Sequence, residues 1–154
     1  MPPGKLVTPA LSTSRIVVNS DINALTQVLD WFAQFNAPPL TYEVWWFCQL
    51  VLTEGFSNAV RHAHRDLPPA TPITVEVNVF ADRIEMRIWD QGAGFDLNRK
   101  LQELDQTLQD PEPEGGMGLV FLQKFADEVD YQRHPEQQQN CLFLRKYLTA
   151  VATA

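Results

Sequence analysis

The sequence has 154 residues, enough for one hydrophobic core and too few for two ordinary domains. Its composition, 45% hydrophobic and 20% charged, is typical of globular proteins, and no apolar run approaches the roughly 18 residues that a transmembrane helix needs. A formal net charge of -7 argues against a nucleic-acid-binding protein, which usually carries a basic surface that neutralises phosphates. The first ten residues lack the features of a secretory signal, so we expect a cytoplasmic protein.

The first part of the sequence predicts a strand followed by two helices. Residues 15–20 have the β-branched content of a short strand. Asp21 is placed to cap a first helix, which should end before a pair of prolines. Apolar residues recur in that helix at three- and four-residue spacing: Ile22, Leu25, Val28, Leu29, Phe32 and Phe35. Thr41 is placed to cap a second helix over 42–64, which should end before the next pair of prolines.

After this second helix the hydrophobic period changes to two, as in β-strands. Alternation over 73–79 and again over 84–88 predicts an antiparallel hairpin with one buried face. A leucine stripe over 97–108 predicts a short amphipathic helix, and an acidic, proline-containing loop over 109–114 follows it. We interpret these two segments together as a mobile cover, or lid.

The last part of the sequence predicts a helix and two paired strands. The apolar segment 119–126 has the character of a short helix. Strands are expected over 127–131 and 142–148, with the polar stretch 134–140 as the loop between them.

These elements indicate a single domain over 15–148, between a flexible arm (1–14) and a flexible tail (149–154). Their order is strand, helix, helix, strand, strand, lid, helix, strand, strand. That order predicts an α+β fold, a two-layer sandwich in which a mixed, mostly antiparallel sheet is covered by helices on one face.

The cysteines and histidines give no strong metal or redox signal. Cys48 and Cys141 lie in apolar patterns, and we interpret both as reduced core residues. A zinc site formed by His62, His64 and His134 is an alternative that the sequence disfavours, since a His-x-His pair at a helix end faces divergent directions.

The second predicted helix carries a row of polar residues in its rear half. Spacing of four puts Glu54, Asn58 and His62 on one helix face. A core helix has no reason to align a carboxylate, an amide and an imidazole, because each would need a hydrogen-bonding partner if buried. The row therefore indicates a functional site.

Two glycine motifs follow that helix in the sequence. The first, Asp90-Gln-Gly-Ala-Gly94, comes at the end of a predicted strand, where its glycines allow close approach of a ligand. The second, Gly115-Gly-Met-Gly118, precedes a predicted helix, whose unpaired N–H groups can bind phosphate. Each motif alone is as typical of an ordinary turn. The sequence lacks the Gly-x-x-x-x-Gly-Lys-Ser/Thr pattern of a P-loop nucleotide site.

Taken together and in this order, the three motifs resemble those of the GHKL-type ATPases, which have the Bergerat fold. Glu54-x-x-x-Asn58 is similar to the N box of that family, Asp90-Gln-Gly-Ala-Gly94 to its first glycine box and Gly116-Met117-Gly118-Leu119 to its second. Within the family the sequence most resembles the bacterial anti-sigma-factor serine/threonine kinases. The resemblance covers roughly residues 15–148.

The resemblance implies roles for residues of the second helix. Asn58 would ligate Mg²⁺ through its amide oxygen, a hard donor suited to this cation. Glu54 would be the general base that accepts a proton from a protein hydroxyl attacking the γ-phosphate of ATP. Arg61 would reach a phosphate, whereas His62 would lie at the edge of the site or in solvent.

It also implies how the glycine boxes would hold ATP. Asp90 would accept a hydrogen bond from the exocyclic amine of adenine, which guanine lacks at that position. Gly92 and Gly94 would let the chain pass against the base. The second box, Gly116-Met117-Gly118-Leu119, would bring backbone amides to the phosphates. Arg99 or Lys100 in the lid would add positive charge on closure, although a basic pair on an exposed helix is usually only solvated.

One departure from the family pattern concerns the support of Asp90. Many members have a Gly-Thr pair at the start of the last strand, whose threonine supports the adenine-binding aspartate. This sequence has Asn140-Cys141 instead. A thiol forms weaker hydrogen bonds than a hydroxyl, so this difference bears on nucleotide affinity.

The resemblance leads to one expected function and two alternatives. The expected protein is a Mg-ATP-dependent kinase that phosphorylates an antagonist protein and binds a sigma factor. It would form a homodimer through its first strand and helix, with neither nucleic acid nor membrane as a direct partner. The first alternative is a nucleotide-dependent partner-switching module without kinase activity. The second, the ATP-binding domain of a histidine kinase, is disfavoured because the roughly 14 residues before the first strand cannot form a phosphoacceptor hairpin.

Overall fold

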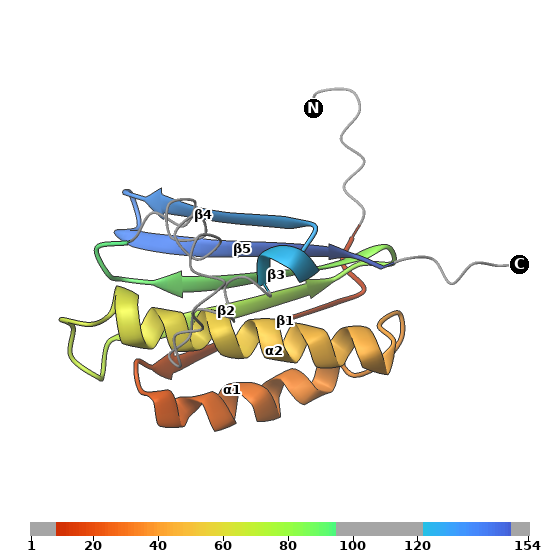
Figure 1. Ribbon diagram of the computed structural model, residues 1–154, viewed down its shortest axis with the longest axis horizontal. Helices are drawn as coiled ribbons and strands as arrows, with labels where there is room; N and C mark the ends of the chain where they lie inside the picture. The colour runs from red at the N-terminus through yellow and green to blue at the C-terminus, as the bar shows by residue number, and fades with distance from the viewer. Residues whose placement is uncertain (1–8, 95–121, 149–154) are drawn as a thin grey trace, which may run out of the picture.

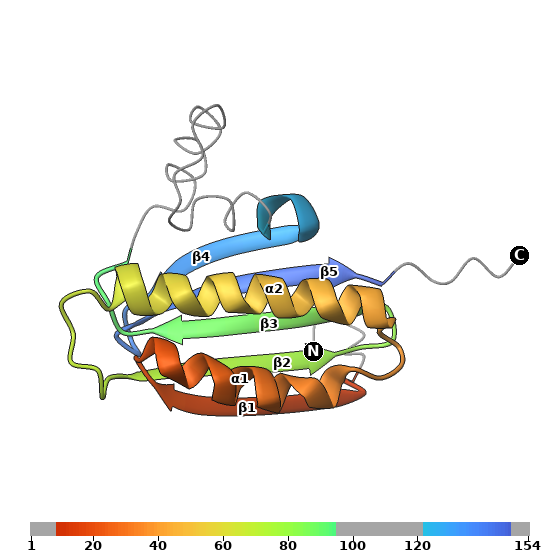
Figure 2. The same cartoon turned by 60° about the horizontal axis from the view of Figure 1, so that its bottom comes forward.

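The computed structural model describes residues 9–94 and 122–148. These residues form a five-stranded sheet in the order β1-β2-β3-β5-β4, with helices α1 and α2 on one face (Figures 1 and 2). The strands are β1 (Ser12–Asn19), β2 (Pro72–Val79), β3 (Arg83–Asp90), β4 (Glu128–His134) and β5 (Gln139–Tyr147). The helices are α1 (Leu25–Phe32) and α2 (Tyr42–Asn58). The predicted two-layer α+β fold is confirmed, with every strand pair of the described residues antiparallel.

Helix α1 begins and ends in single 3-10 turns, Ile22–Ala24 before it and Ala33–Phe35 after it. The predicted cap is confirmed, since the Asp21 carboxylate accepts a hydrogen bond of 2.9 Å from the backbone N–H of Asn23. Three residues of the predicted apolar stripe are fully buried, Val28, Phe32 and Phe35, and Leu29 is half-buried. Ile22, at the start of the stripe, is exposed.

Helix α2 also has its predicted cap, because the backbone N–H of Val44 donates to Thr41 Oγ1 at 3.2 Å. The predicted continuous helix over 42–64 is wrong in its last turn. The chain is α-helical to Asn58 and then forms a π-helical turn, Ala59–Ala63, in which the N–H of His64 donates to Ala59 O at 2.8 Å. Such turns hold one extra residue per hydrogen bond and occur often at functional sites.

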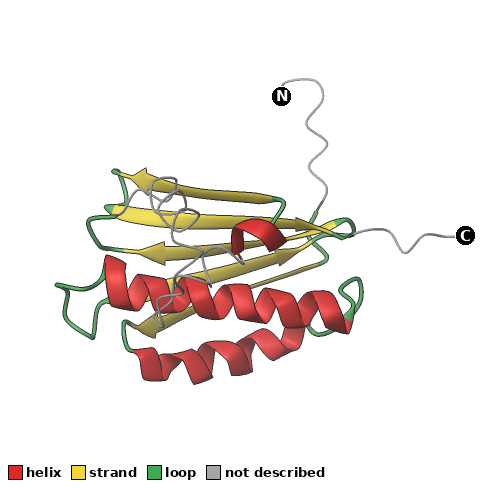
Figure 3. Cartoon of the chain, in the orientation of Figure 1, coloured by secondary structure: helices red, strands yellow, loops and turns green. Residues whose placement is uncertain are grey.

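The hydrophobic core lies between the helices and the sheet (Figure 3). Strands β2 and β3 bury alternate residues against α2, as their period of two predicts. The buried residues of the two strands are Ile73, Val75, Val77, Val79, Ile84, Met86 and Ile88. Gly55 lets α2 lie close to the sheet, because a Cβ at this position would be 2.5 Å from Ile88 Cδ1. No helix in the described parts of the chain is long and apolar enough to cross a membrane.

Three strand boundaries differ from the sequence prediction by three residues, and the others agree within two. Strand β1 starts at Ser12 rather than at residue 15, because residues 12–19 all pair with β2. The turn between β4 and β5 occupies only 135–138, so the strands extend into the polar stretch 134–140. Polar side chains hid this extension, since hydrophobic alternation cannot detect a strand end whose buried residue is an asparagine. The predicted lid and the first three residues of the predicted helix over 119–126 lie outside the described residues, and residues 122–125 are helical.

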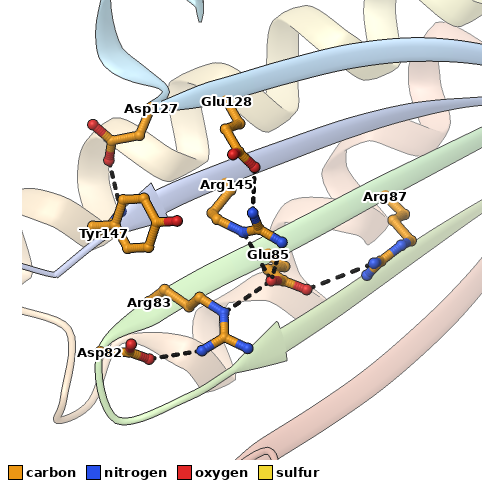
Figure 4. Close-up of polar contacts among 8 residues, drawn as sticks. All are labelled: Asp82, Arg83, Glu85, Arg87, Asp127, Glu128, Arg145 and Tyr147. Atoms are coloured by element: carbon orange, nitrogen blue, oxygen red, sulfur yellow. Dashed lines mark hydrogen bonds and ion pairs between the residues drawn. The ribbon is translucent and has the colours of Figure 1, made fainter. Parts of the chain in front are cut away.

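On the sheet face opposite the helices, one buried carboxylate lies among three arginines (Figure 4). Glu85 Oε2 accepts hydrogen bonds from Arg83 Nε at 2.9 Å and from Arg145 Nε at 3.0 Å. Arg87 Nη2 lies 3.6 Å from the other oxygen, Oε1. Burial alone would raise the pKa of Glu85, but the hydrogen bonds from Arg83 and Arg145 and the charge of the arginines outweigh it and lower the pKa.

We expect Glu85→Gln to lower the free energy of unfolding at neutral pH by about 1–3 kcal/mol, because a neutral amide with a single acceptor oxygen replaces the carboxylate that accepts from the arginines. A lowered pKa in the folded state stabilises the fold above the ordinary glutamate pKa, and this stability is lost as pH falls through the folded pKa. The difference between wild type and variant should therefore shrink in acid, measured by urea unfolding between pH 7 and pH 3.

The matched control is Asp82→Asn, because Asp82 contacts Arg83 at 2.8 Å but its side chain is 66% exposed. An exposed ion pair contributes about 0–1 kcal/mol, so this variant should remain close to wild type. Equal losses in the two variants, or a Glu85→Gln loss independent of pH, would contradict the structural role assigned to Glu85.

Candidate functional site

Asp90 is the last residue of β3 and is 3% exposed. Its Oδ1 accepts hydrogen bonds from the backbone N–H of Gly92 at 2.9 Å and from Asn140 Nδ2 at 2.8 Å. Its Oδ2 accepts a hydrogen bond of 2.8 Å from the Tyr131 hydroxyl. A buried carboxylate needs such donors, because burying it without them costs roughly several kcal/mol of folding free energy. The side chain is thus held in one orientation by groups from three places in the sheet.

The residue that supports Asp90 from the last strand is Asn140 rather than Cys141. In the β3–β5 pairing Asp90 lies opposite Asn140, and Trp89 lies opposite Cys141. Because successive residues of a strand face opposite sides, Cys141 points to the sheet face away from Asp90. The comparison of Cys141 with the threonine of the family pattern is therefore wrong, and a primary amide takes that place. Both cysteines are buried and unpaired, as predicted.

The first glycine box is held tightly against the end of the π turn. A Cβ on Gly92 would be 1.8 Å from the carbonyl oxygen of Ala63, so no side chain fits there. Gly92 O accepts hydrogen bonds from Asn140 Nδ2 at 2.9 Å and Arg133 Nη1 at 3.1 Å. Gly94 has φ 86°, the left-handed region in which glycine is favoured. The sequence predicted close approach of a ligand at these glycines. In the structure the close neighbours are the Ala63 backbone for Gly92 and the Asn140 side chain for Gly94.

A small hollow between α2 and the sheet contains the predicted polar groups. Its walls combine residues of the helix and of three strands: Gly55, Asn58, Ala59, Ile88, Asp90, Tyr131 and Leu142. Asn58 and Asp90, which are 32 positions apart in the sequence, thus border the same space. The hollow has a volume of about 10 Å³, the size of about one water molecule, so it brings one amide and one carboxylate together without enclosing space for a larger ligand.

Glu54 lies one helical turn before Asn58 and is half-buried. Burial raises the pKa of its carboxyl group, and the positive charge of Arg61 opposes this effect. Arg61 and His62 are both exposed on the π turn. Because the π turn breaks the spacing of four after Asn58, the predicted row is reduced to Glu54 and Asn58, with His62 outside it.

His64 has a structural role at this site that the sequence interpretation missed. It is 3% exposed, and its Nε2 accepts a hydrogen bond of 2.7 Å from the backbone N–H of Gln91. Burial lowers the pKa of this imidazole, with the charge of Asp90 acting in the opposite direction. Neutral His64 therefore joins the end of the π turn to the first glycine box.

Two other residues that the sequence interpretation missed, Tyr131 and Arg133, lie on β4. They share one face of the strand with Val129, the face that carries Asp90, and this spacing of two was the only signal in the sequence. The predicted residues Gly116, Met117, Gly118 and Leu119, with Arg99 and Lys100, lie outside the described residues.

The donor chemistry around Asn58 fits Mg²⁺. Its side-chain amide oxygen is a hard, neutral donor, and Mg²⁺ typically takes one or two protein ligands and completes its coordination with water and phosphate oxygens. Asn58 is 8% exposed and borders the hollow, so it can supply one ligand. Within 9–94 and 122–148 no three His, Cys, Asp or Glu residues gather as they would around a metal ion.

The structure combines an antiparallel sheet covered by helices on one face with a pair of polar residues on α2 and a glycine turn after β3. A family model described as histidine kinase-like ATPase domain matches residues 18–146, which is most of the chain. The chain therefore belongs to the histidine kinase-like ATPase domain family, and the resemblance to GHKL ATPases is confirmed.

Among curated relatives, the chain is similar to serine-protein kinases named RsbW. The protein of Bacillus subtilis (strain 168) is 32% identical over 90 residues, covering 56% of this chain and 56% of that protein. The protein of Listeria innocua serovar 6a is 30% identical over 93 residues, covering 58% of this chain and 59% of that protein. The chain thus spans little more than half the length of the curated relatives it matches.

Proposed function

We propose that this chain is a Mg-ATP-dependent protein serine/threonine kinase that phosphorylates an antagonist protein and binds a sigma factor or similar regulator. Membership of the ATPase family supports the use of ATP, and the relatives named as serine-protein kinases support the kinase class. The observation that carries the proposal is the placement of half-buried Glu54, with its raised pKa, one turn before Asn58.

In the proposed reaction Glu54 is the general base. It accepts the proton of a serine or threonine hydroxyl as the oxygen attacks the γ-phosphorus, and the bond to the leaving ADP oxygen breaks. A raised pKa brings the carboxylate closer to the working pH, which favours proton transfer. Asn58 holds Mg²⁺, which neutralises charge on the phosphates when bound.

Asp90 is the proposed reader of the base. Its buried, hydrogen-bonded carboxylate accepts from the exocyclic amino group of adenine, whereas guanine presents a carbonyl oxygen there. Gly92 and Gly94 leave two positions of the following turn without a side chain, and the exposed Arg61 is the proposed phosphate contact from the π turn.

The test is transfer of label from γ-labelled ATP to candidate antagonist proteins. We expect acid-stable label on a serine or threonine of one such protein, with no transfer when Mg²⁺ is chelated. Measurable ATP binding without transfer to any partner would contradict the kinase and favour the partner-switching module. Acid-labile label on a histidine would instead favour a histidine-kinase-type domain.

The proposed protein is a homodimer formed through its first strand. β1 lies at one edge of the described sheet, so one side of its backbone is available for pairing. Leu11, which is 63% exposed, and Val17, which is 51% exposed, are large apolar residues at this edge. Light scattering should give twice the mass of the chain, and a monomeric mass at high concentration would contradict the dimer.

A further inference from the structure

Tyr131 reaches Asp90, the carboxylate proposed to read the base, from two strands away. Tyr131 belongs to β4, and β4 is separated from β3 by β5 in the sheet. Its side chain nevertheless crosses β5 and donates to Asp90 Oδ2 at 2.8 Å. Tyr131 also borders the hollow that contains Asn58 and Asp90. It therefore contacts the carboxylate directly and lies beside the same small hollow as Asn58.

The donors at Asp90 are divided between its two oxygens. Oδ1 is held by the N–H of Gly92 and the amide of Asn140, which fix the position of that oxygen. Oδ2 is held by the Tyr131 hydroxyl, which fixes the rotation of the carboxylate about its own axis. An ionised carboxylate has about four lone-pair sites, so Oδ2 can accept a ligand N–H in addition to the hydroxyl.

The Tyr131 hydroxyl is a persistent donor to this carboxylate. Burial is the main cause that raises the pKa of Tyr131, and the negative charge of Asp90 and its hydrogen bond raise it further. The phenol therefore keeps its proton throughout the physiological range. Because a bond to a charged acceptor is about twice as strong as one between neutral groups, the hydroxyl favours Asp90 over a carbonyl oxygen on a ligand.

We propose that Tyr131 is a positioning residue that sets base specificity, by holding Asp90 Oδ2 where it accepts from an exocyclic amino group. This proposal rests on the proposed ATP-binding function and deepens it. A 6-amino purine can donate a hydrogen bond to the oriented Oδ2 of Asp90. A 6-oxo purine cannot, because it places a carbonyl oxygen, itself an acceptor, against Oδ2. Removing the Tyr131 hydroxyl, which leaves the Asp90 carboxylate free to rotate, therefore weakens only the binding of the 6-amino purine.

The test compares Mg-ATP with Mg-ITP, whose base carries a carbonyl oxygen in place of the amino group, in wild type and Tyr131→Phe. Phenylalanine keeps the ring, so packing is retained and thermal unfolding checks the fold. We expect the Kd for ATP to rise roughly fivefold to tenfold, the loss of about one hydrogen bond, while the Kd for ITP changes less than about twofold. The ratio of the Kd for ITP to the Kd for ATP should then fall by nearly the same factor as the Kd for ATP rises.

Gln132→Ala is the matched control, because Gln132 is the exposed neighbour on the opposite sheet face and should leave both affinities unchanged. An unchanged ATP-over-ITP preference in Tyr131→Phe would overturn the inference, whether both nucleotides weaken together or neither does. Failure of the wild type to bind Mg-ATP would overturn the proposed function instead, so the two failures are distinguishable.

Discussion

Replacing Glu54 by glutamine is expected to lower the rate of phosphoryl transfer by about 10²- to 10⁴-fold, the usual contribution of a general base. Glutamine has nearly the same shape but cannot accept the proton of the attacking hydroxyl. Glu54 is one turn away from Asn58 and is not part of the hollow that contains Asp90, so the Kd for Mg-ATP should change by less than about threefold. Single-turnover transfer and equilibrium nucleotide binding measure the two quantities separately.

The pH dependence of transfer gives a second readout for Glu54. Burial raises the pKa of this carboxyl group, so the rate should fall in acid at a pH above the ordinary value of a glutamate. The Glu54→Gln variant should not show this fall in the transfer rate in acid. Glu43→Gln removes the same charge from an exposed position in the first turn of α2 and should transfer phosphate at the wild-type rate. Equal rates in Glu54→Gln and wild type would contradict the assigned base.

The fold could be predicted because its signals are local. Asp21 and Thr41 mark helix starts through bonds to residues two and three positions later, and those bonds are present. The alternation of apolar and polar residues in β2 and β3 indicates which side of each strand faces the helices. The two-layer arrangement could therefore be predicted from the sequence. The π turn has no such signal, since a helix that widens by one residue keeps the same composition.

The site was predicted only where its residues form short motifs. Glu54 and Asn58 are one turn apart, and Asp90 and Gly92 share one turn of chain. The groups that hold Asp90 come from positions 41 and 50 residues later, and their places depend on the register of β5 against β3 and β4. A shift of register by one residue would exchange Asn140 for Cys141, which is the error that the family comparison made from the sequence.

Burial of polar residues was the other obstacle. Asn140 is 1% exposed and His64 is 3% exposed, yet hydrophobic patterns assign such residues to loops. Both are buried because each has a backbone partner near Asp90: Gly92 O for Asn140, and the N–H of Gln91 for His64. These bonds connect the helix end, the glycine turn and the last hairpin into one polar network, which satisfies groups that would otherwise be costly to bury.

That network makes Gly92 the position at which a single methyl group should have the largest effect on nucleotide binding. In Gly92→Ala the new Cβ would lie 1.8 Å from Ala63 O, a backbone atom that cannot rotate away, so the turn itself must move. Movement would break the bond from Gly92 N–H to Asp90 and those from Asn140 and Arg133 to Gly92 O. Losing two or more such bonds should raise the Kd for Mg-ATP about 100-fold or more, measured by titration calorimetry.

The strands should survive the Gly92→Ala substitution, because Gly92 lies beyond the end of β3 and outside the apolar core. Far-ultraviolet circular dichroism should therefore remain native, while the free energy of unfolding falls by about 2–4 kcal/mol through the lost hydrogen bonds. Ala93→Ser changes the exposed neighbour in the same turn and should leave both quantities unchanged. Near-normal ATP affinity in Gly92→Ala would mean that the turn can move away from Ala63 without disturbing Asp90. The buried network would then have no part in fixing Asp90, the carboxylate proposed to read the base.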